Sequence, residues 1–267
     1  MTDARRESEI RDARMPVIFV GHGTPMNAVE ENAFVATWRR WGETLPKPRA
    51  VLCVSAHWET RGTQVTAMPQ PRTIHDFYGF PPELTAIRYA APGDPQLAEA
   101  LAAAEGVTRD ETWGLDHGCW SVLKYVYPKA DVPVVQLSLS RDLSPREHYA
   151  LGRTLRDLRR QGILIIGSGN MVHNLRLVSF RDEDSGFGFD WALEANALFK
   201  RLIDEERHDA LMDYPALGHA AQLAVPTPEH FLPMLYALAL KEPGEPLRYF
   251  NDAPWGGSLT MTSFVIG

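Results

Sequence analysis

The sequence predicts an α/β fold, with a single domain built on a mainly parallel central sheet flanked by helices. Three observations lead to this fold class. Short apolar runs alternate with segments of helical periodicity, which is typical of α/β layers. The runs are continuous rather than alternating, as in strands whose two faces are both covered. The chain has 267 residues with 45% hydrophobic content, which is ample for one sizeable core.

Strands are predicted wherever a short apolar run rich in β-branched residues stands between turn or helix signals. Two further segments near the C-terminus are predicted to complete the sheet. In chain order, the six predicted strands are Pro16–Val20, Ala50–Ser55, Val132–Leu139, Ile163–Ile166, Leu247–Phe250 and Ser258–Ile266.

Helices are predicted between the strands from their capping signals. Asp94, placed before a proline, reads as an N-cap. Ser144 and Glu147 fit a capping box. Asp190 is predicted to cap a helix, and Thr227, again before a proline, to open the last one.

Charge and cysteine content narrow the function classes. The net charge is -7 and the pI is about 5.7. The basic residues form no long cluster, so we expect neither a nucleic-acid partner nor an anionic membrane surface. No apolar run is long enough to span a bilayer. Cys53 and Cys119 sit in apolar surroundings and suggest no disulfide framework, which favours a reducing, cytoplasmic setting.

The first segment of the chain differs from the rest. Residues 1–14 are highly charged and lack the apolar core of a secretory signal. We therefore predict a flexible N-terminal arm over residues 1–14 and one catalytic domain over residues 15–267.

Three histidines follow predicted strands. His22 comes after the first strand, His57 after the second, and His173 a short loop after the fourth. Ligands in open α/β sheets gather beyond the carboxyl ends of the strands. Small residues before each histidine let the backbone turn and leave room for an ion or a substrate. We expect these three side chains to share a site.

A fourth histidine, His230, is placed differently. With Thr227 as N-cap, it lies in the first turn of the predicted last helix, beside Glu229. The positive end of a helix dipole disfavours imidazolium, and a metal needs the neutral ring. A single histidine of this kind is more often structural, but four together point to a metal site. The spacing matches neither a zinc finger nor an HExxH helix, so it does not by itself establish a metal.

His117 leaves two interpretations open. It lies in WGLDHGCW, predicted as a loop between two tryptophans. It is either an acid or hydrogen-bond donor in a pocket, or a loop histidine packed against tryptophan.

Several multi-residue motifs carry a resemblance to a known family. They are GHGTPMNAVE (21–30), VSAHWETRGTQVTAM (54–68), TIHDFYGFP (73–81), WGLDHGCWSVL (113–123), GSGNMVHNLR (167–176) and TPEHFLPMLY (227–236). In this order they resemble the DODA-type extradiol aromatic ring-opening dioxygenases of the class III, LigB-like group. The chain is similar to the bacterial 4,5-DOPA members of that group from about Met15 onward.

The resemblance implies an enzyme that uses Fe(II) and O2 to cleave a catechol, such as DOPA or a similar diphenol, next to its hydroxyls. It also implies a ring-opened semialdehyde as product and zinc as an alternative occupant of the same site. By motif, His22 and His57 would be metal ligands and His230 a further ligand. His173 would be a ligand or the active-site base, and His117 would face substrate or dioxygen.

Some alternatives stay open on the sequence alone. Fe(II) oxygenases usually bind iron through two histidines and a carboxylate, so either His230 or Glu229 could be the third ligand. An all-histidine set also suits a zinc-dependent hydrolase, the second functional hypothesis. A non-catalytic metal-binding protein is the third. The physiological substrate, the native metal and the oligomeric state are not defined by the sequence.

Overall fold

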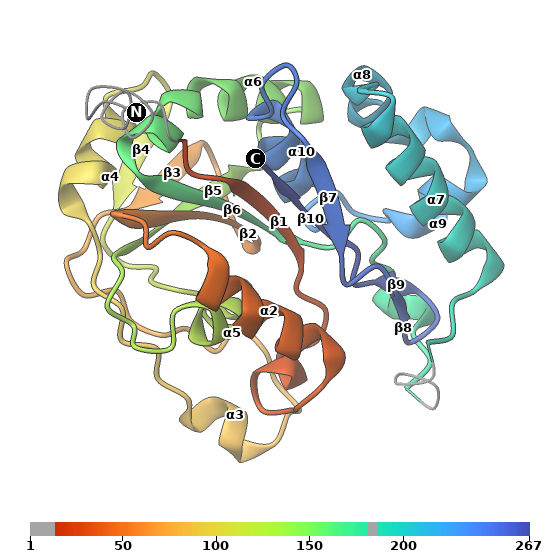
Figure 1. Cartoon of the computed structure of the whole chain (residues 1–267), viewed down its shortest axis with the longest axis horizontal. Coiled ribbons are helices and arrows are strands. Elements are labelled where there is room, and N and C mark those ends of the chain that lie inside the picture. Colours follow the sequence, from red (N-terminus) through yellow and green to blue (C-terminus); the bar gives the residue numbers. More distant parts are fainter. Residues whose placement is uncertain (1–13, 181–185) are drawn as a thin grey trace, which may run out of the picture.

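An eight-stranded sheet runs through the protein in the computed structural model, which describes residues 14–180 and 186–267 (Figure 1). The strand order is β4-β3-β5-β2-β6-β1-β10-β7. The strands of this sheet are β1 Val17–Gly21, β2 Ala50–Thr60, β3 Thr63–Thr66, β4 Val107–Asp110, β5 Val134–Ser140, β6 Ile163–Gly169, β7 Leu247–Phe250 and β10 Ser263–Ile266. A small second sheet pairs β8 Pro254–Trp255 with β9 Leu259–Thr260.

The centre of the large sheet is parallel, as the sequence predicts. β1, β6, β2 and β5 are paired in parallel with one another. Antiparallel pairs join β10 to β1, β7 to β10 and β3 to β5. The parallel centre therefore directs the carboxyl ends of β1, β6 and β2 to the same edge.

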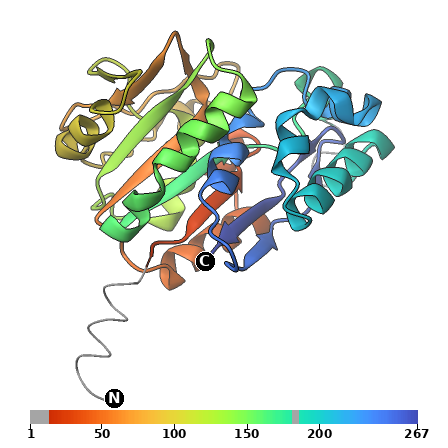
Figure 2. The ribbon, with the colours of Figure 1, turned by 90° about the horizontal axis from the view of Figure 1, so that it is seen from above.

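Helices cover both faces of the sheet (Figures 1 and 2). Figure 2 shows α6 and α10 crossing the strands on one face, with α7 to α9 gathered at one end. The first face carries α2 Ala33–Thr44, α3 Pro82–Ala86 and α5 His117–Val126. The second carries α4 Pro95–Ala102, α6 Pro145–Thr154, α7 Asp190–Asp204, α8 His208–Met212, α9 His219–Ala224 and α10 Leu232–Ala239. Two apolar clusters, one on each face, fill the space between the layers.

Two predicted helix starts are confirmed and two are wrong. Asp94 caps α4, and Ser144 with Glu147 forms the capping box of α6. Asp190 lies inside the first turn of α7, which has no side-chain cap. The last helix begins at Leu232 rather than after Thr227.

The late start of α10 changes the argument about His230. Proline lacks a backbone N–H, so Pro233 is tolerated only in the first turn of a helix. The preceding segment instead forms a turn in which Phe231 and Leu232 both donate to the Pro228 carbonyl. His230 therefore precedes the helix, and the prediction that placed it in the first turn, at the positive end of the helix dipole, is wrong.

Three other boundaries differ from the predictions. The expected strand 258–266 is interrupted at Met261, whose N–H donates to the Ala253 carbonyl, so β9 and β10 belong to different sheets. His57 lies inside the longer β2 rather than after it. His117 is the first residue of α5 rather than part of a loop, because Asp116 caps that helix. The strands β3 and β4 were not predicted.

Two further expectations concern the N-terminal arm and membrane-spanning helices. Most of the predicted flexible arm, residues 1–13, lies outside the described residues. Arg14 forms ion pairs with Glu242 and Glu245. Within residues 14–180 and 186–267, every helix is too short or too polar to cross a membrane.

A buried histidine on α6 gives the fold an acid sensitivity. His148 is fully buried; its Nε2 lies 3.1 Å from the Ser140 carbonyl and its Nδ1 2.9 Å from the Tyr236 hydroxyl. Burial lowers the pKa of His148 to about 4 from its usual 6.5. Between these values the unfolded chain binds a proton that the folded one excludes, so folding stability falls as the pH falls.

We expect this one histidine to cost about 3 kcal/mol of folding stability on going from pH 7 to pH 4. Urea denaturation of the metal-free protein at several pH values measures the effect. His148→Gln should reduce the dependence by about this amount, whatever it does to stability at pH 7. An unchanged slope in that variant would assign the acid sensitivity to other groups.

Candidate metal centre

The candidate site lies at the carboxyl ends of three neighbouring strands. In the sheet, β6 lies between β1 and β2. His22 directly follows β1, and its N–H donates to the Gly169 carbonyl at the end of β6. His173 lies four residues beyond β6. The expected convergence at this edge follows from the parallel pairing.

His57 is placed by an irregularity in β2. The pairing of β2 with β5 shifts register between Val54 and Glu59. Such bulges bend a strand and redirect a side chain, and they are common beside active sites. The half-buried His57 ring is thereby turned toward His22 rather than packed into the sheet.

His230 is held against β6 by a close backbone contact. The Asn170 N–H donates to the His230 carbonyl at 2.9 Å. A Cβ atom at Gly169 would lie only 2.1 Å from that oxygen, so only glycine permits the approach. The turn before α10 therefore delivers the His230 ring to the strand ends.

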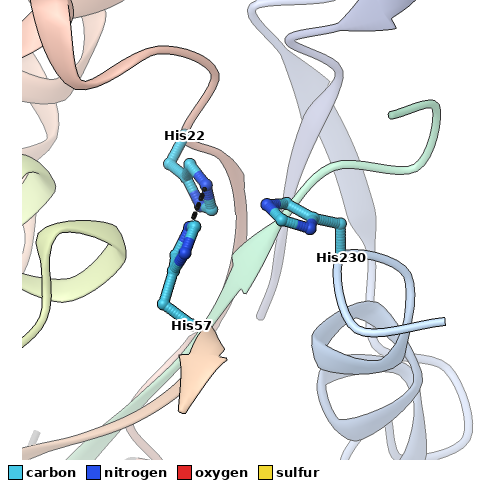
Figure 3. A group of neighbouring side chains, drawn as sticks. All are labelled: His22, His57 and His230. Carbon is cyan, nitrogen blue, oxygen red and sulfur yellow. Dashed lines mark hydrogen bonds between the residues drawn. The ribbon is translucent and has the colours of Figure 1, made fainter. Parts of the chain in front are cut away.

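The three rings converge on one point (Figure 3). One ring nitrogen from each of His22, His57 and His230 lies within 4.8 Å of the others. The Nε2 atoms of His22 and His57 face each other at 3.0 Å, and His230 approaches from the side of α10. His22 and His230 are buried, with 1% and 7% of their surface exposed.

The opposite nitrogen of each ring faces an oxygen. Ser168 Oγ donates to the Gly118 carbonyl, so it accepts from His22 Nδ1, 2.9 Å away. His57 Nδ1 lies 3.3 Å from a carboxylate oxygen of Asp76. His230 Nδ1 lies 3.1 Å from Glu229 Oε1. Each Nδ1 thus has an acceptor for its hydrogen, which leaves the Nε2 lone pair for a cation.

Burial keeps these rings neutral. It is the first cause that lowers the pKa of His22, His57 and His230 well below 6.5. Repulsion from neighbouring histidines lowers these pKa values further. At His57 the negative charge of Asp76 acts in the opposite direction and raises the pKa. Neutral imidazole is the form that binds a metal at pH 7.

The donor set fits a divalent transition metal. Two nitrogens bound tetrahedrally at the usual metal distance of 2.0–2.1 Å lie about 3.3 Å apart, close to the His22–His57 separation. Two hydrogen-free nitrogens facing each other repel unless a cation lies between them. Three imidazoles leave further positions open, as a catalytic site requires.

Glu229 groups with a different set of residues. Its carboxylate lies within 4.8 Å of ring nitrogens of His173 and His230. His230 also belongs to the set formed with His22 and His57, which does not include Glu229. Glu229 also accepts from the Thr227 hydroxyl at 2.9 Å. The geometry therefore places Glu229 as a partner of the His230 ring and favours His230 for the third position.

His173 lies against His230. The two rings are stacked, with centroids 3.5 Å apart and planes 8° from parallel. The His173 N–H donates to the Ala224 carbonyl, which fixes its backbone. Burial, with a smaller contribution from His117, lowers the pKa of His173 to about 4. At pH 7 this ring is a neutral proton acceptor beside the converging histidines.

His117 lies on the other side, with its ring centroid 3.9 Å from that of His57. Its Nδ1 is 2.9 Å from Asp76 Oδ2. Burial alone would raise the pKa of Asp76, but hydrogen bonding and charge from His117, together with charge from His57, lower it to about 2. Asp76 was not predicted as a site residue, although it lies in the motif TIHDFYGFP. A carboxylate beside an aromatic residue in a loop has no periodic pattern that would mark it.

Aromatic side chains close the site near His117. The Phe77 ring lies 5.5 Å from the His117 ring, centroid to centroid. Trp120 is fully buried and donates from its indole to the Ile74 carbonyl at 2.8 Å. Tyr78 is 96% exposed. Phe77 is thus an apolar wall beside the histidines, whereas Tyr78 is not part of it.

Gly118 packs closely against the His57 ring and limits its position. A Cβ at this position would lie 2.6 Å from Ser55 Oγ and 2.9 Å from His57 Cδ2. Gly118→Ala should push the His57 ring out of line and cost about 1–3 kcal/mol in overpacking. We expect weaker Zn(II) binding by calorimetry with the fold retained by circular dichroism. Unchanged zinc affinity would show that His57 is not held by this contact.

The parallel sheet and its buried histidines define an α/β protein with a site suited to a divalent metal. The chain belongs to the LigB family: the model for the catalytic LigB subunit of aromatic ring-opening dioxygenase matches residues 15–251. It is an enzyme of the extradiol ring-cleaving dioxygenase class.

Relatives agree over the length of the chain. A protein of Escherichia coli K12 named 4,5-DOPA dioxygenase extradiol is 44% identical and is covered completely, as is this chain. A Beta vulgaris protein of the same name is 34% identical over 92% of this chain and 94% of its own. The crystal structure of the uncharacterized protein JW3007 from Escherichia coli K12 is similar, with TM-score 0.82 and 42% identity over 95% of this chain and all of that one.

Proposed function

We propose that the protein cleaves the ring of a catechol, DOPA or a similar diphenol, with O2 to give a ring-opened semialdehyde. His22, His57 and His230 would hold Fe(II). One observation carries the proposal: the His22 and His57 Nε2 atoms meet at 3.0 Å while their Nδ1 atoms face oxygen partners. The names of the relatives support the reaction and the substrate class.

A bound divalent iron would lower the pKa of the catechol hydroxyls and supply the redox chemistry toward dioxygen. His173 takes one hydroxyl proton, since its ring is neutral at pH 7 and stacked against His230. Phe77 and the buried histidines exclude water from the side of α5. Asp76 orients His117 and His57.

The experiment is an oxygen-uptake assay. Anaerobically Fe(II)-loaded protein is mixed with DOPA, a protocatechuate-type acid or an unsubstituted catechol, and O2 is then admitted. We expect one O2 consumed per catechol and a yellow product whose mass equals catechol plus two oxygen atoms. No uptake with any member of the panel would contradict the proposal.

A zinc-dependent hydrolase is the second candidate, because neutral imidazoles with open metal positions also activate water. Zinc-loaded protein tested on ester and amide panels separates the two. Hydrolysis without O2 uptake would support a zinc-dependent hydrolytic activity of the same site, and inactivity in both assays would contradict the proposed reaction.

The proposed partners are a small catechol and O2. We also propose a cytoplasmic location, in keeping with the two cysteines, both free and buried.

A further inference from the structure

One carboxylate touches two histidines of the site. Asp76 Oδ2 lies 2.9 Å from His117 Nδ1 and 3.3 Å from His57 Nδ1. The two imidazoles are packed together, with ring centroids 3.9 Å apart. A single oxygen thus faces a proposed metal ligand and a ring proposed to face the substrate.

The second carboxylate oxygen makes the arrangement rigid. Asp76 Oδ1 accepts from the His117 backbone N–H at 2.9 Å. The Asp76 side chain therefore binds both the backbone and the ring of His117. This two-point contact fixes the ring orientation as well as its distance.

The loop that carries Asp76 is tied to the scaffold close by. The Ile74 N–H donates to the Leu115 carbonyl at 2.7 Å, and the Ile74 carbonyl accepts from the Trp120 indole at 2.8 Å. Asp76 is only 14% exposed. A largely buried carboxylate on an anchored loop is suited to orienting other groups.

We propose that Asp76 is the positioning residue that sets the tautomers of both His57 and His117, an inference that rests on the proposed metal-dependent function. By accepting the Nδ1 hydrogen of each ring, it leaves Nε2 of each without hydrogen. His57 can then bind the cation through Nε2. In the neutral form of its ring, His117 then presents Nε2 to the site as a hydrogen-bond acceptor.

Nitrogen NMR reads the tautomers directly. Long-range ¹H–¹⁵N spectra of the metal-free protein should show His117 protonated at Nδ1, and spectra of the zinc-loaded protein should show the same for His57. His148 is an internal reference, because Ser140 and Tyr236 favour the opposite tautomer there. A hydrogen on His117 Nε2 in the metal-free protein would overturn the proposal, as would zinc on Nδ1 of either ring.

Zinc affinity tests the same residue without turnover. Asp76→Ala should weaken Zn(II) binding about 10–100-fold, and Asp76→Asn, which keeps an oxygen acceptor, should lose less. Asp94→Asn is the matched control, since Asp94 likewise accepts a backbone N–H at a helix start but lies outside the site. Wild-type affinity in Asp76→Ala would overturn the proposal.

These outcomes are independent of ring cleavage. If the alanine variant does not fold, the wild-type spectra still decide the tautomers. If zinc binds as expected but no catechol consumes O2, the proposed reaction fails and the role of Asp76 stands.

Discussion

We expect His22→Ala to abolish metal binding and to reduce ring cleavage to background. Removing one of three converging imidazoles leaves two nitrogens and a cavity where the third ring was. The loss of a donor also removes the partner of the His57 Nε2 atom. Metal content after loading, measured by elemental analysis, and O2 uptake with DOPA test the expectation together.

The matched control is His219→Ala, because His219 is exposed and lies outside the candidate metal centre. That variant should bind one metal per chain as the wild type does. Thermal denaturation of both variants without metal separates ligand loss from misfolding. Retained metal in a folded His22→Ala protein would remove His22 from the ligand set.

The second large effect is expected at His173. His173→Ala should lower kcat about 10²–10⁴-fold, the usual contribution of general acid–base assistance, while metal is still bound. We expect the metal to be retained because the His173 ring is stacked on His230 and is not part of the set formed by His22, His57 and His230. Single-turnover ring cleavage by the loaded protein measures the chemical step.

His173→Gln supports the distinction, since it keeps polarity without a basic ring. Both variants should load metal like the wild type. A His173 variant that loses metal as completely as His22→Ala would make His173 a ligand instead of a base.

Much of the fold could be predicted because it depends on local signals. The parallel strands are recognisable in the sequence as apolar runs, and Asp94 and Ser144 mark the starts of two helices. Neither β3 nor β4 was predicted, since each is short and β4 is only partly buried. The late start of α10 depends on which of two prolines, Pro228 or Pro233, occupies the first turn.

The site was predictable in its residues but not in its contacts. His22, His57, His173 and His230 are all brought to one edge of the sheet, and the parallel topology explains why. His57 needed a register shift that no sequence pattern reveals.

The contacts that orient the histidine rings join residues far apart in the sequence. Asp76 is 41 residues from His117, and Ser168 is 146 residues from His22. Such pairs form only after the sheet and α5 are assembled, so periodicity and capping rules cannot reach them.

The most direct test is anomalous diffraction from crystals of the zinc-loaded protein. We expect one strong peak about 2.0–2.1 Å from Nε2 of His22, His57 and His230, with at least one position open to solvent. A peak on Asp76 and His117 instead, or none near the three rings, would contradict it.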